Sequence, residues 1–160
     1  MRALAPFYDL TSARLFRYAL TITRNRHDAE DVVQQAIVQL ALHPQGVADA
    51  LQPWAYCLTV LRNEALRVVR KRPVTTVMAD SANPLETEDP SGFEVNETVA
   101  AALATLPASQ AEVVALKVWE QMTFAEIAEV LGQSPNTVAS RYRYALEKLT
   151  KQLQPLRDRV

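Results

Sequence analysis

Residues 123–144 constrain the fold of this chain more than any other segment, because they read as two short helices joined by a tight turn. Thr123 is a suitable N-cap, and Glu126 follows at the spacing of a capping box. Gly132 suits the left-handed residue that ends a helix. A serine followed by Pro135 suits the cap and first position of the next helix. The segment therefore predicts a helix-turn-helix.

The second of these helices has an apolar side and a polar, basic side. Apolar residues recur at helical spacing from Val138 to Leu149, which predicts the side that packs on a core. A polar helix held by a short preceding helix suits the major groove of DNA. Exposed arginines are also common on surfaces that bind nothing, so the motif alone leaves DNA binding open. The candidate DNA-binding residues are Asn136, Thr137, Ser140, Arg141 and Arg143.

Composition and charge distribution indicate how the chain is divided. Only 3 residues are glycine and 49% are hydrophobic, which favours a helical protein with an ample core. The net charge of -1 results from an uneven distribution of charge along the chain, since residues 73–99 carry six acids and no base. Prolines in the same stretch indicate an extended linker. We predict an all-α fold with two small helical domains, residues 1–73 and 96–160, joined by an acidic linker at 74–95.

The N-terminal domain is expected to contain three helices. The first spans residues 7–24, and Asp28 is the expected cap of the second, which runs to about Leu42. Residues 43–49 are expected to form a loop, because they include a proline and a glycine. The third helix begins near Pro53 and ends in a basic run that comprises Arg67, Arg70, Lys71 and Arg72. Cations stabilise a helix C-terminus, but this run exceeds what a cap requires.

Two blocks of sequence resemble the ECF-type bacterial sigma factors. The first is Asp-Ala-Glu-Asp-Val-Val-Gln-Gln-Ala at 28–36, followed by Trp54, the Arg-Asn pair at 62–63 and the basic helix end. The second comprises residues 106–113, the Phe-Ala-Glu-Ile-Ala-Glu-Val-Leu-Gly run at 124–132 and the Thr-Val-Ala-Ser-Arg run that ends at residue 141. The resemblance covers nearly the whole chain in order. It implies a dissociable subunit of RNA polymerase that directs promoter recognition and has no catalytic activity.

The resemblance also implies which residues contact which partner. The loop at 44–52 and the third helix would face the downstream promoter element, and the helix-turn-helix would read the upstream element. The acidic linker would pass through the RNA exit path of the polymerase, and an anti-sigma factor is an expected partner. Downstream promoter contacts would be Arg62, Asn63, Arg67, Arg70 and Lys71. Contacts with the clamp helices of the largest polymerase subunit would be Asp28, Asp31, Gln34, Gln35 and Val38. The polymerase flap is expected as a further contact.

The sequence departs from the family pattern at several of these positions. Ala139 stands where a lysine or arginine is frequent, which removes one expected DNA contact. Gln35 stands where glutamate is usual, so the docking face carries less charge. The segment 44–52 has no aromatic or basic residue to hold a flipped base.

Other functions make different demands on the sequence. A helix-turn-helix regulator that binds operator DNA without polymerase would share the second domain. A metal-dependent helical-bundle enzyme would need Glu-x-x-His pairs, and neither histidine follows a glutamate at that spacing. A single cysteine, Cys57, excludes an internal disulfide. We expect no metal, cofactor or catalytic residue, no membrane insertion and a cytoplasmic location.

Overall fold

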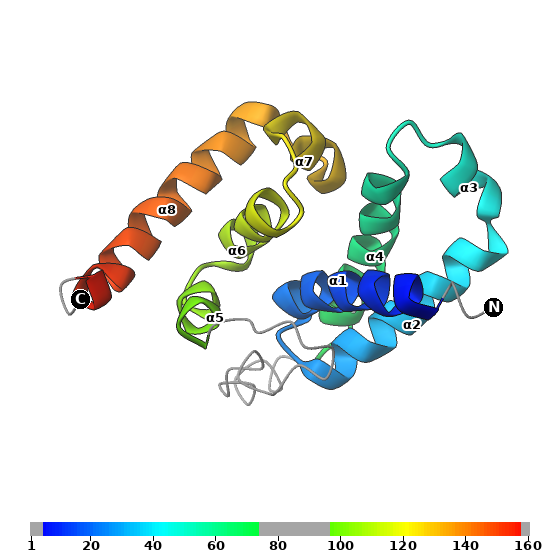
Figure 1. The fold of residues 1–160 in the computed structure, drawn as a ribbon, viewed down its shortest axis with the longest axis horizontal. Helices are drawn as coiled ribbons and strands as arrows, with labels where there is room; N and C mark the ends of the chain where they lie inside the picture. Colours follow the sequence, from blue (N-terminus) through cyan, green and yellow to red (C-terminus); the bar gives the residue numbers. More distant parts are fainter. Residues whose placement is uncertain (1–4, 74–96, 158–160) are drawn as a thin grey trace. The chain divides into compact units, whose positions relative to one another are not determined.

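The computed structural model describes residues 5–73 and 97–157, and every regular element in these ranges is a helix. The chain divides into two compact units, which we call the N-terminal unit (Met1–Glu94) and the C-terminal unit (Val95–Val160). Figure 1 shows the helices of both. The all-α prediction is confirmed for the described residues. The predicted acidic linker at 74–95 lies outside them.

Three helices of the N-terminal unit pack against one another, and a fourth, short helix contacts two of them. They are α1 (Ala5–Thr23), α2 (Arg26–Leu42), α3 (Pro44–Asp49) and α4 (Pro53–Arg70). Their shared core is formed by apolar residues at helical spacing, as predicted from the sequence. Its buried members include Leu15, Tyr18, Ala19, Val32, Val33, Ala36, Leu58, Leu61 and Ala65.

Helix α2 begins one turn earlier than the sequence predicted. Its N-cap is Asn25, whose side chain accepts a 2.9 Å hydrogen bond from the backbone N–H of Asp28. Asp28 therefore lies in the first turn, and its prediction as the cap was wrong. Asparagine and aspartate are nearly equivalent caps, so local preference could not separate them. Arg24, with φ of 52°, makes the preceding turn in the left-handed region.

The predicted loop at 43–49 was also wrong, because residues 44–49 form α3. Pro44 occupies the first turn of this helix, where its missing N–H is not needed. Gly46 lies against the ring of Tyr56 on α4. A Cβ added at Gly46 would lie 2.7 Å from the Cζ atom of Tyr56. The glycine therefore allows α3 to approach α4 closely, which a reading of turn propensity misses.

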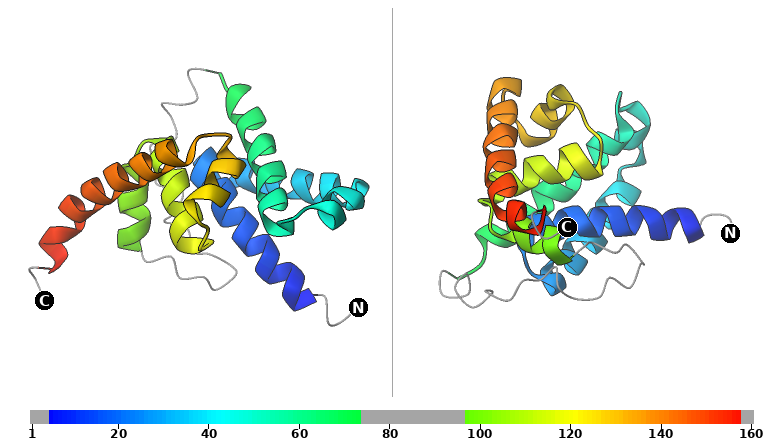
Figure 2. Two further views of the ribbon diagram at one scale, coloured as in Figure 1. Left: turned by 90° about the horizontal axis from the view of Figure 1, so that it is seen from above. Right: turned by 60° about the vertical axis from the view of Figure 1, so that its left-hand side comes forward.

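The C-terminal unit contains α5 (Glu97–Ala104), α6 (Ala108–Val114), η2 (Ala115–Trp119), α7 (Phe124–Leu131) and α8 (Pro135–Arg157). Helix α6 continues into η2, a π-helical stretch. The long helix α8 contacts α5, α6 and α7 (Figures 1 and 2). Near its C-terminal end, Gln152 donates a 2.6 Å hydrogen bond to the hydroxyl of Thr105. The core includes Leu103, Leu106, Ala111, Val114 and Ala145.

The turn between α7 and α8 has the predicted helix-turn-helix geometry. Thr123 caps α7, and its hydroxyl accepts a 3.1 Å hydrogen bond from the backbone N–H of Glu126. Gly132 ends that helix with φ of 64°. Ser134 then accepts a 3.2 Å hydrogen bond from the backbone N–H of Thr137, and α8 begins at Pro135.

Candidate nucleic-acid interface

The outward face of α8 carries three of the five predicted DNA-binding residues. Asn136, Ser140 and Arg143 recur at spacings of four and three, opposite the fully buried Val138 and Ala145. Asn136 and Arg143 are exposed, and Ser140 is half-buried. Polar side chains therefore project from one side of a helix whose other side is fixed to a core. This is the arrangement by which a recognition helix presents side chains to base edges.

Thr137 and Arg141 lie on one flank of that face, and both are half-buried. The hydroxyl of Thr137 lies 2.9 Å from the hydroxyl of Ser134, within the cap of α8. Thr137 is therefore partly engaged in stabilising the helix start. Arg141 lies one turn after Thr137, closer to the side of α8 that packs on the core. From such a position the stem of an arginine lies along the helix surface and its guanidinium extends into solvent.

Arg143 is paired with an aromatic ring. Its guanidinium carbon lies 5.4 Å from the ring centroid of the exposed Tyr144. An aromatic face attracts a cation without cancelling its charge. Arg143 therefore keeps a full positive charge at the surface of the C-terminal unit.

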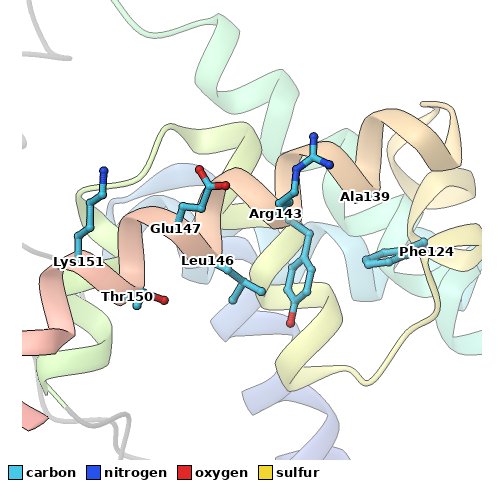
Figure 3. A pocket seen from close by; sticks show the side chains of 8 residues that line it. Phe124, Ala139, Arg143, Leu146, Glu147, Thr150 and Lys151 are labelled. Carbon is cyan, nitrogen blue, oxygen red and sulfur yellow. The ribbon is translucent and has the colours of Figure 1, made fainter.

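An open hollow of about 750 Å³ lies beside α8 and the start of α7 (Figure 3). The aromatic rings of Phe124 and Tyr142 meet there at a centroid distance of 5.6 Å. Leu146 is 40% exposed and points to one side of α8, while Arg143 and the other charged side chains point to the opposite side. The hollow is thus an apolar surface beside the polar face. Its remaining lining residues are Ala139, Glu147, Thr150 and Lys151.

The second predicted DNA-binding surface lies on α4. Asn63, Arg67 and Arg70 recur at spacings of four and three, and all three are exposed. Lys71, also exposed, is the C-cap residue of the helix. Arg62 is half-buried and lies off this face, although it was predicted as a member of the same group. The structure thus brings Asn63, Arg67 and Arg70 together on one exposed face.

Arg67 is held by a buried acid on its own helix. Glu64 is buried, and its Oε1 atom accepts a 3.1 Å hydrogen bond from Nε of Arg67 and a second, short one from Nη2. Its Oε2 atom accepts a 3.1 Å hydrogen bond from the Gln39 side chain on α2. The hydrogen bond and the charge of Glu64 raise the pKa of Arg67. The carboxylate thus joins the helix predicted to bind polymerase to the helix predicted to bind DNA.

A second ion pair joins the end of α4 to the start of α2. The Arg72 guanidinium donates to Oδ2 of Asp28 from Nη2 at 2.5 Å and from Nε at 3.1 Å. Both side chains are largely covered, with 14% and 28% of their surfaces exposed. Because Asp28 is engaged in this way, it serves the N-terminal unit internally as well as lying near the predicted polymerase-binding face.

The remaining predicted polymerase-binding residues form a single exposed face of α2. Asp31, Gln34, Gln35 and Val38 recur at spacings of three, one and three, and all are exposed. Val38 has 48% of its surface exposed, so it adds apolar area to this otherwise polar face. His27 lies 3.6 Å from the Asp31 carboxylate, an exposed contact that leaves this face accessible.

The described residues offer little for metal binding or nucleophilic chemistry. In residues 5–73 and 97–157, no three His, Cys, Asp or Glu side chains gather in a way that could hold a metal ion. No helix in the same part of the chain is long and apolar enough to cross a membrane. Cys57 is half-buried, and burial raises the pKa of its thiol. A raised pKa lowers thiolate content, so this cysteine is poorly suited to nucleophilic chemistry.

Sequence reasoning missed Glu64, Gln39 and the hollow beside α8. A signal for Glu64 was available, because it falls on the inner side of α4 next to Leu61 and Ala65. An acid at an inner helical position requires a buried partner. The hollow had no comparable signal, since Phe124 and Tyr142, which line it, both read as members of a core.

The chain matches two known protein families in succession. Residues 7–73 match the family described as Sigma-70 region 2, which includes the faces of α2 and α4 described above. Residues 96–149 match the family described as Sigma-70, region 4, which includes the helix-turn-helix.

Individual relatives agree with these matches. The chain is 35% identical to the ECF RNA polymerase sigma factor SigL of Mycobacterium tuberculosis, across 98% of this chain and 90% of that protein. It is 30% identical to the RNA polymerase sigma-E factor of Streptomyces avermitilis, across 88% and 79%. A structural relative is the sigma factor RpoE of Bartonella quintana, solved in complex with the anti-sigma factor NepR. It has a TM-score of 0.76 at 21% identity, covering 96% of this chain and 98% of that one, which supports the shared fold.

Proposed function

This chain belongs to the ECF sigma factors, and we propose that it binds core RNA polymerase and directs it to promoters through one DNA contact in each unit. The observation that carries the proposal is the presence of Sigma-70 regions 2 and 4 in one chain and in that order. A regulator that binds its operator alone requires only the second of these regions.

In the N-terminal unit, the exposed face of α2 is our candidate for the contact with the clamp helices of the largest polymerase subunit. Its support is an exposed apolar residue, Val38, bordered by the polar Gln34 and Gln35 and the acidic Asp31. A mixed face of this kind suits a protein partner, because its apolar part gains from burial and its polar rim sets orientation. Asp28 contributes chiefly by fixing the end of α4 through Arg72.

The face of α4 is our candidate for the downstream promoter contact. Arg70 and Lys71 are exposed cations suited to phosphates, and Asn63 is an exposed amide suited to a base edge. Arg62 would contribute from the side of this face. The short segment after α3 leads into the N-terminal end of α4, away from this face, and its exposed Leu51 is neither aromatic nor basic.

In the C-terminal unit, the outward face of α8 is our candidate for the upstream promoter contact. We assign Asn136, Ser140 and Arg143 to base edges, and Thr137 and Arg141 to the sugar-phosphate backbone. Support for this division comes from the spacing of the first three and the flanking position of the other two. The apolar hollow beside α8 is our candidate for the polymerase flap contact, since Leu146 and Phe124 offer area that DNA would not use.

The functional boundaries we propose are a polymerase- and promoter-binding domain at 1–73, an acidic linker at 74–95 and an upstream-reading domain at 96–160. We further propose that the protein has no catalytic activity of its own, acts in the cytoplasm and is held by an anti-sigma factor. The family matches at 7–73 and 96–149 support the two domains, and the relatives' names, which are those of RNA polymerase sigma factors, support a role other than catalysis. The complex of the structural relative RpoE with an anti-sigma factor supports the last of these statements.

Run-off transcription with core polymerase tests the proposal. The full chain is combined with core polymerase on a library of promoter templates, and the start sites and yields of transcripts are measured. We expect initiation on a subset of templates only when both the chain and the core polymerase are present. The absence of promoter-dependent transcripts on every template, together with failure to bind core, would refute it.

A further inference from the structure

We propose that Arg67 reads a base of the downstream promoter element, and that the buried Glu64 is the positioning residue that holds it for this role. The inference rests on the proposed function, since it takes a promoter contact on α4 as its premise. It adds a distinction among the cations of that face, which the sequence presents as equivalent.

The carboxylate of Glu64 is fixed from two directions. Arg67 binds its Oε1 atom from the same helix, and Gln39 binds its Oε2 atom from α2. Only 6% of the Glu64 side chain is exposed. A buried carboxylate loses its hydration, so it retains hydrogen-bonding partners far more strongly than an exposed one does. Exposed ion pairs on a helix contribute little stability, but the Glu64–Arg67 pair persists because Glu64 is buried.

The geometry leaves Arg67 partly committed and partly available. Half of its side chain is exposed, at 50%, while Glu64 takes the Nε–H and one N–H of Nη2. A guanidinium has five N–H donors in a rigid plane, so donors on both terminal nitrogens remain for an outside partner. Those donors form a fork of fixed direction. Such a fork matches two adjacent acceptors, as on the O6/N7 edge of guanine or the O2/N3 edge of an unpaired cytosine.

The same pairing makes Arg67 a poor phosphate contact. The negative charge of Glu64 offsets the positive charge of Arg67, so the pair adds little to the field that attracts DNA. Arg70 lies one turn further on the same face and is exposed. It retains the character of a cation that neutralises a phosphate. The face therefore contains one cation held for selectivity and another suited to general affinity.

The test uses holoenzyme assembled from core polymerase and the full chain, on promoters randomised across the downstream element. Arg67→Ala should reduce the preference for guanine or cytosine at one position, on the order of tenfold, with little change in average yield. Arg67→Lys should lose the same preference, because a lysine keeps the charge but lacks the planar fork. The control, Arg70→Ala, should lower yields evenly and reduce the salt slope by about one.

A further variant tests the positioning role. Glu64→Gln removes the charge but keeps the shape, and it should weaken the same base preference while core binding is unchanged. If circular dichroism shows that this variant does not fold, Glu64→Asp takes its place, because it keeps the charge but shortens the reach to Arg67, and it should weaken the same preference.

Three outcomes would overturn the inference. Arg67→Ala could lower all templates evenly, as Arg70→Ala does, which would make Arg67 a phosphate contact. Arg67→Lys could retain the preference, or a folded Glu64→Gln could leave it intact. Failure of the proposed function looks different, because wild-type chain would then direct no promoter-dependent initiation on any template.

Discussion

Helices α4 and α8 both present an arginine on an exposed face, but they hold it by different chemistry. On α4, the buried carboxylate of Glu64 binds Arg67 and offsets its charge. On α8, the ring of Tyr144 lies beside Arg143 and leaves its charge intact. Two residues that count equally in a sum of charges therefore differ in what they offer DNA. The comparison shows that the partner of a basic residue decides its function as much as its position does.

This difference predicts separate electrostatic behaviour for the two units. The surface around Arg143 should attract duplex DNA in a strongly salt-dependent way. Arg67 itself should contribute selectivity with a smaller dependence on salt than Arg143 or its neighbour Arg70.

The first prediction concerns the separate cores of the two units. Leu61→Ala should destabilise the N-terminal unit, and Ile127→Ala the C-terminal unit, each by about 2–5 kcal/mol, because both side chains are fully buried. Each unit contains one tryptophan, Trp54 or Trp119, so fluorescence in denaturant reports on the units separately. If either substitution shifted both transitions equally, the units would share one cooperative core.

The second prediction compares one glycine in each unit. Gly46→Ala should destabilise the N-terminal unit by about 1–3 kcal/mol through overpacking against Tyr56. Gly132→Ala should destabilise the C-terminal unit by about 1–2 kcal/mol through its left-handed backbone, since its surroundings are open.

Rescue separates the two causes. Tyr56→Leu should recover part of the stability lost in Gly46→Ala, as measured by thermal unfolding. Gly132→Asn should be milder than Gly132→Ala, because asparagine tolerates the left-handed region. Equal stabilities of Gly46→Ala with and without Tyr56→Leu would contradict the steric explanation.

The third prediction concerns the upstream contact. Arg143→Ala should change base preference by roughly tenfold at one position of the upstream element, as expected for lost base-edge contacts. Arg141→Ala should weaken binding evenly across sequences and reduce the salt slope by about one. Holoenzyme binding to upstream-randomised promoters at several salt concentrations measures both. Matching changes in specificity for the two variants would show that our division of roles is wrong.

The fourth and smallest prediction compares the helix caps. Asn25→Ala should destabilise the N-terminal unit, and Thr123→Ala the C-terminal unit, each by about 1 kcal/mol. Chemical denaturation followed by the tryptophan of each unit measures the two effects. Asp28→Asn is a control for Asn25→Ala. It leaves the Asn25 cap in place and removes only the negative charge of Asp28, to which Arg72 binds. A larger loss in Asp28→Asn than in Asn25→Ala would indicate that the ion pair outweighs the cap.

Local signals predicted the C-terminal unit better than the N-terminal unit. The helix-turn-helix is specified by neighbouring residues, since Thr123, Gly132 and Pro135 each act on their own turn. Helix α3 could not be predicted in this way. Its six residues include a proline and a glycine, and its position depends on Tyr56 from the next helix. Tertiary packing therefore overrode local turn preference.

In the candidate site, too, the features set by local spacing could be predicted and those set by packing between helices could not. The exposed faces of α2, α4 and α8 were predictable, because helical spacing alone separates their outward residues from the core. The contact between Gln39 and Glu64 joins residues 25 positions apart and required the packing of two helices. Glu64 and Arg67 are three positions apart on α4, so their pairing could have been found from helical spacing, unlike the contact with Gln39.

The central claim is that this chain acts as a subunit of RNA polymerase, and its binding to isolated partners tests this most directly. Fluorescently labelled chain is titrated separately with core polymerase and with promoter duplex at one salt concentration. We predict tight binding to core polymerase, weak binding to duplex alone, and promoter-selective binding only when core polymerase is present. Tight, sequence-selective binding to duplex by the chain alone, with no affinity for core polymerase, would contradict the account.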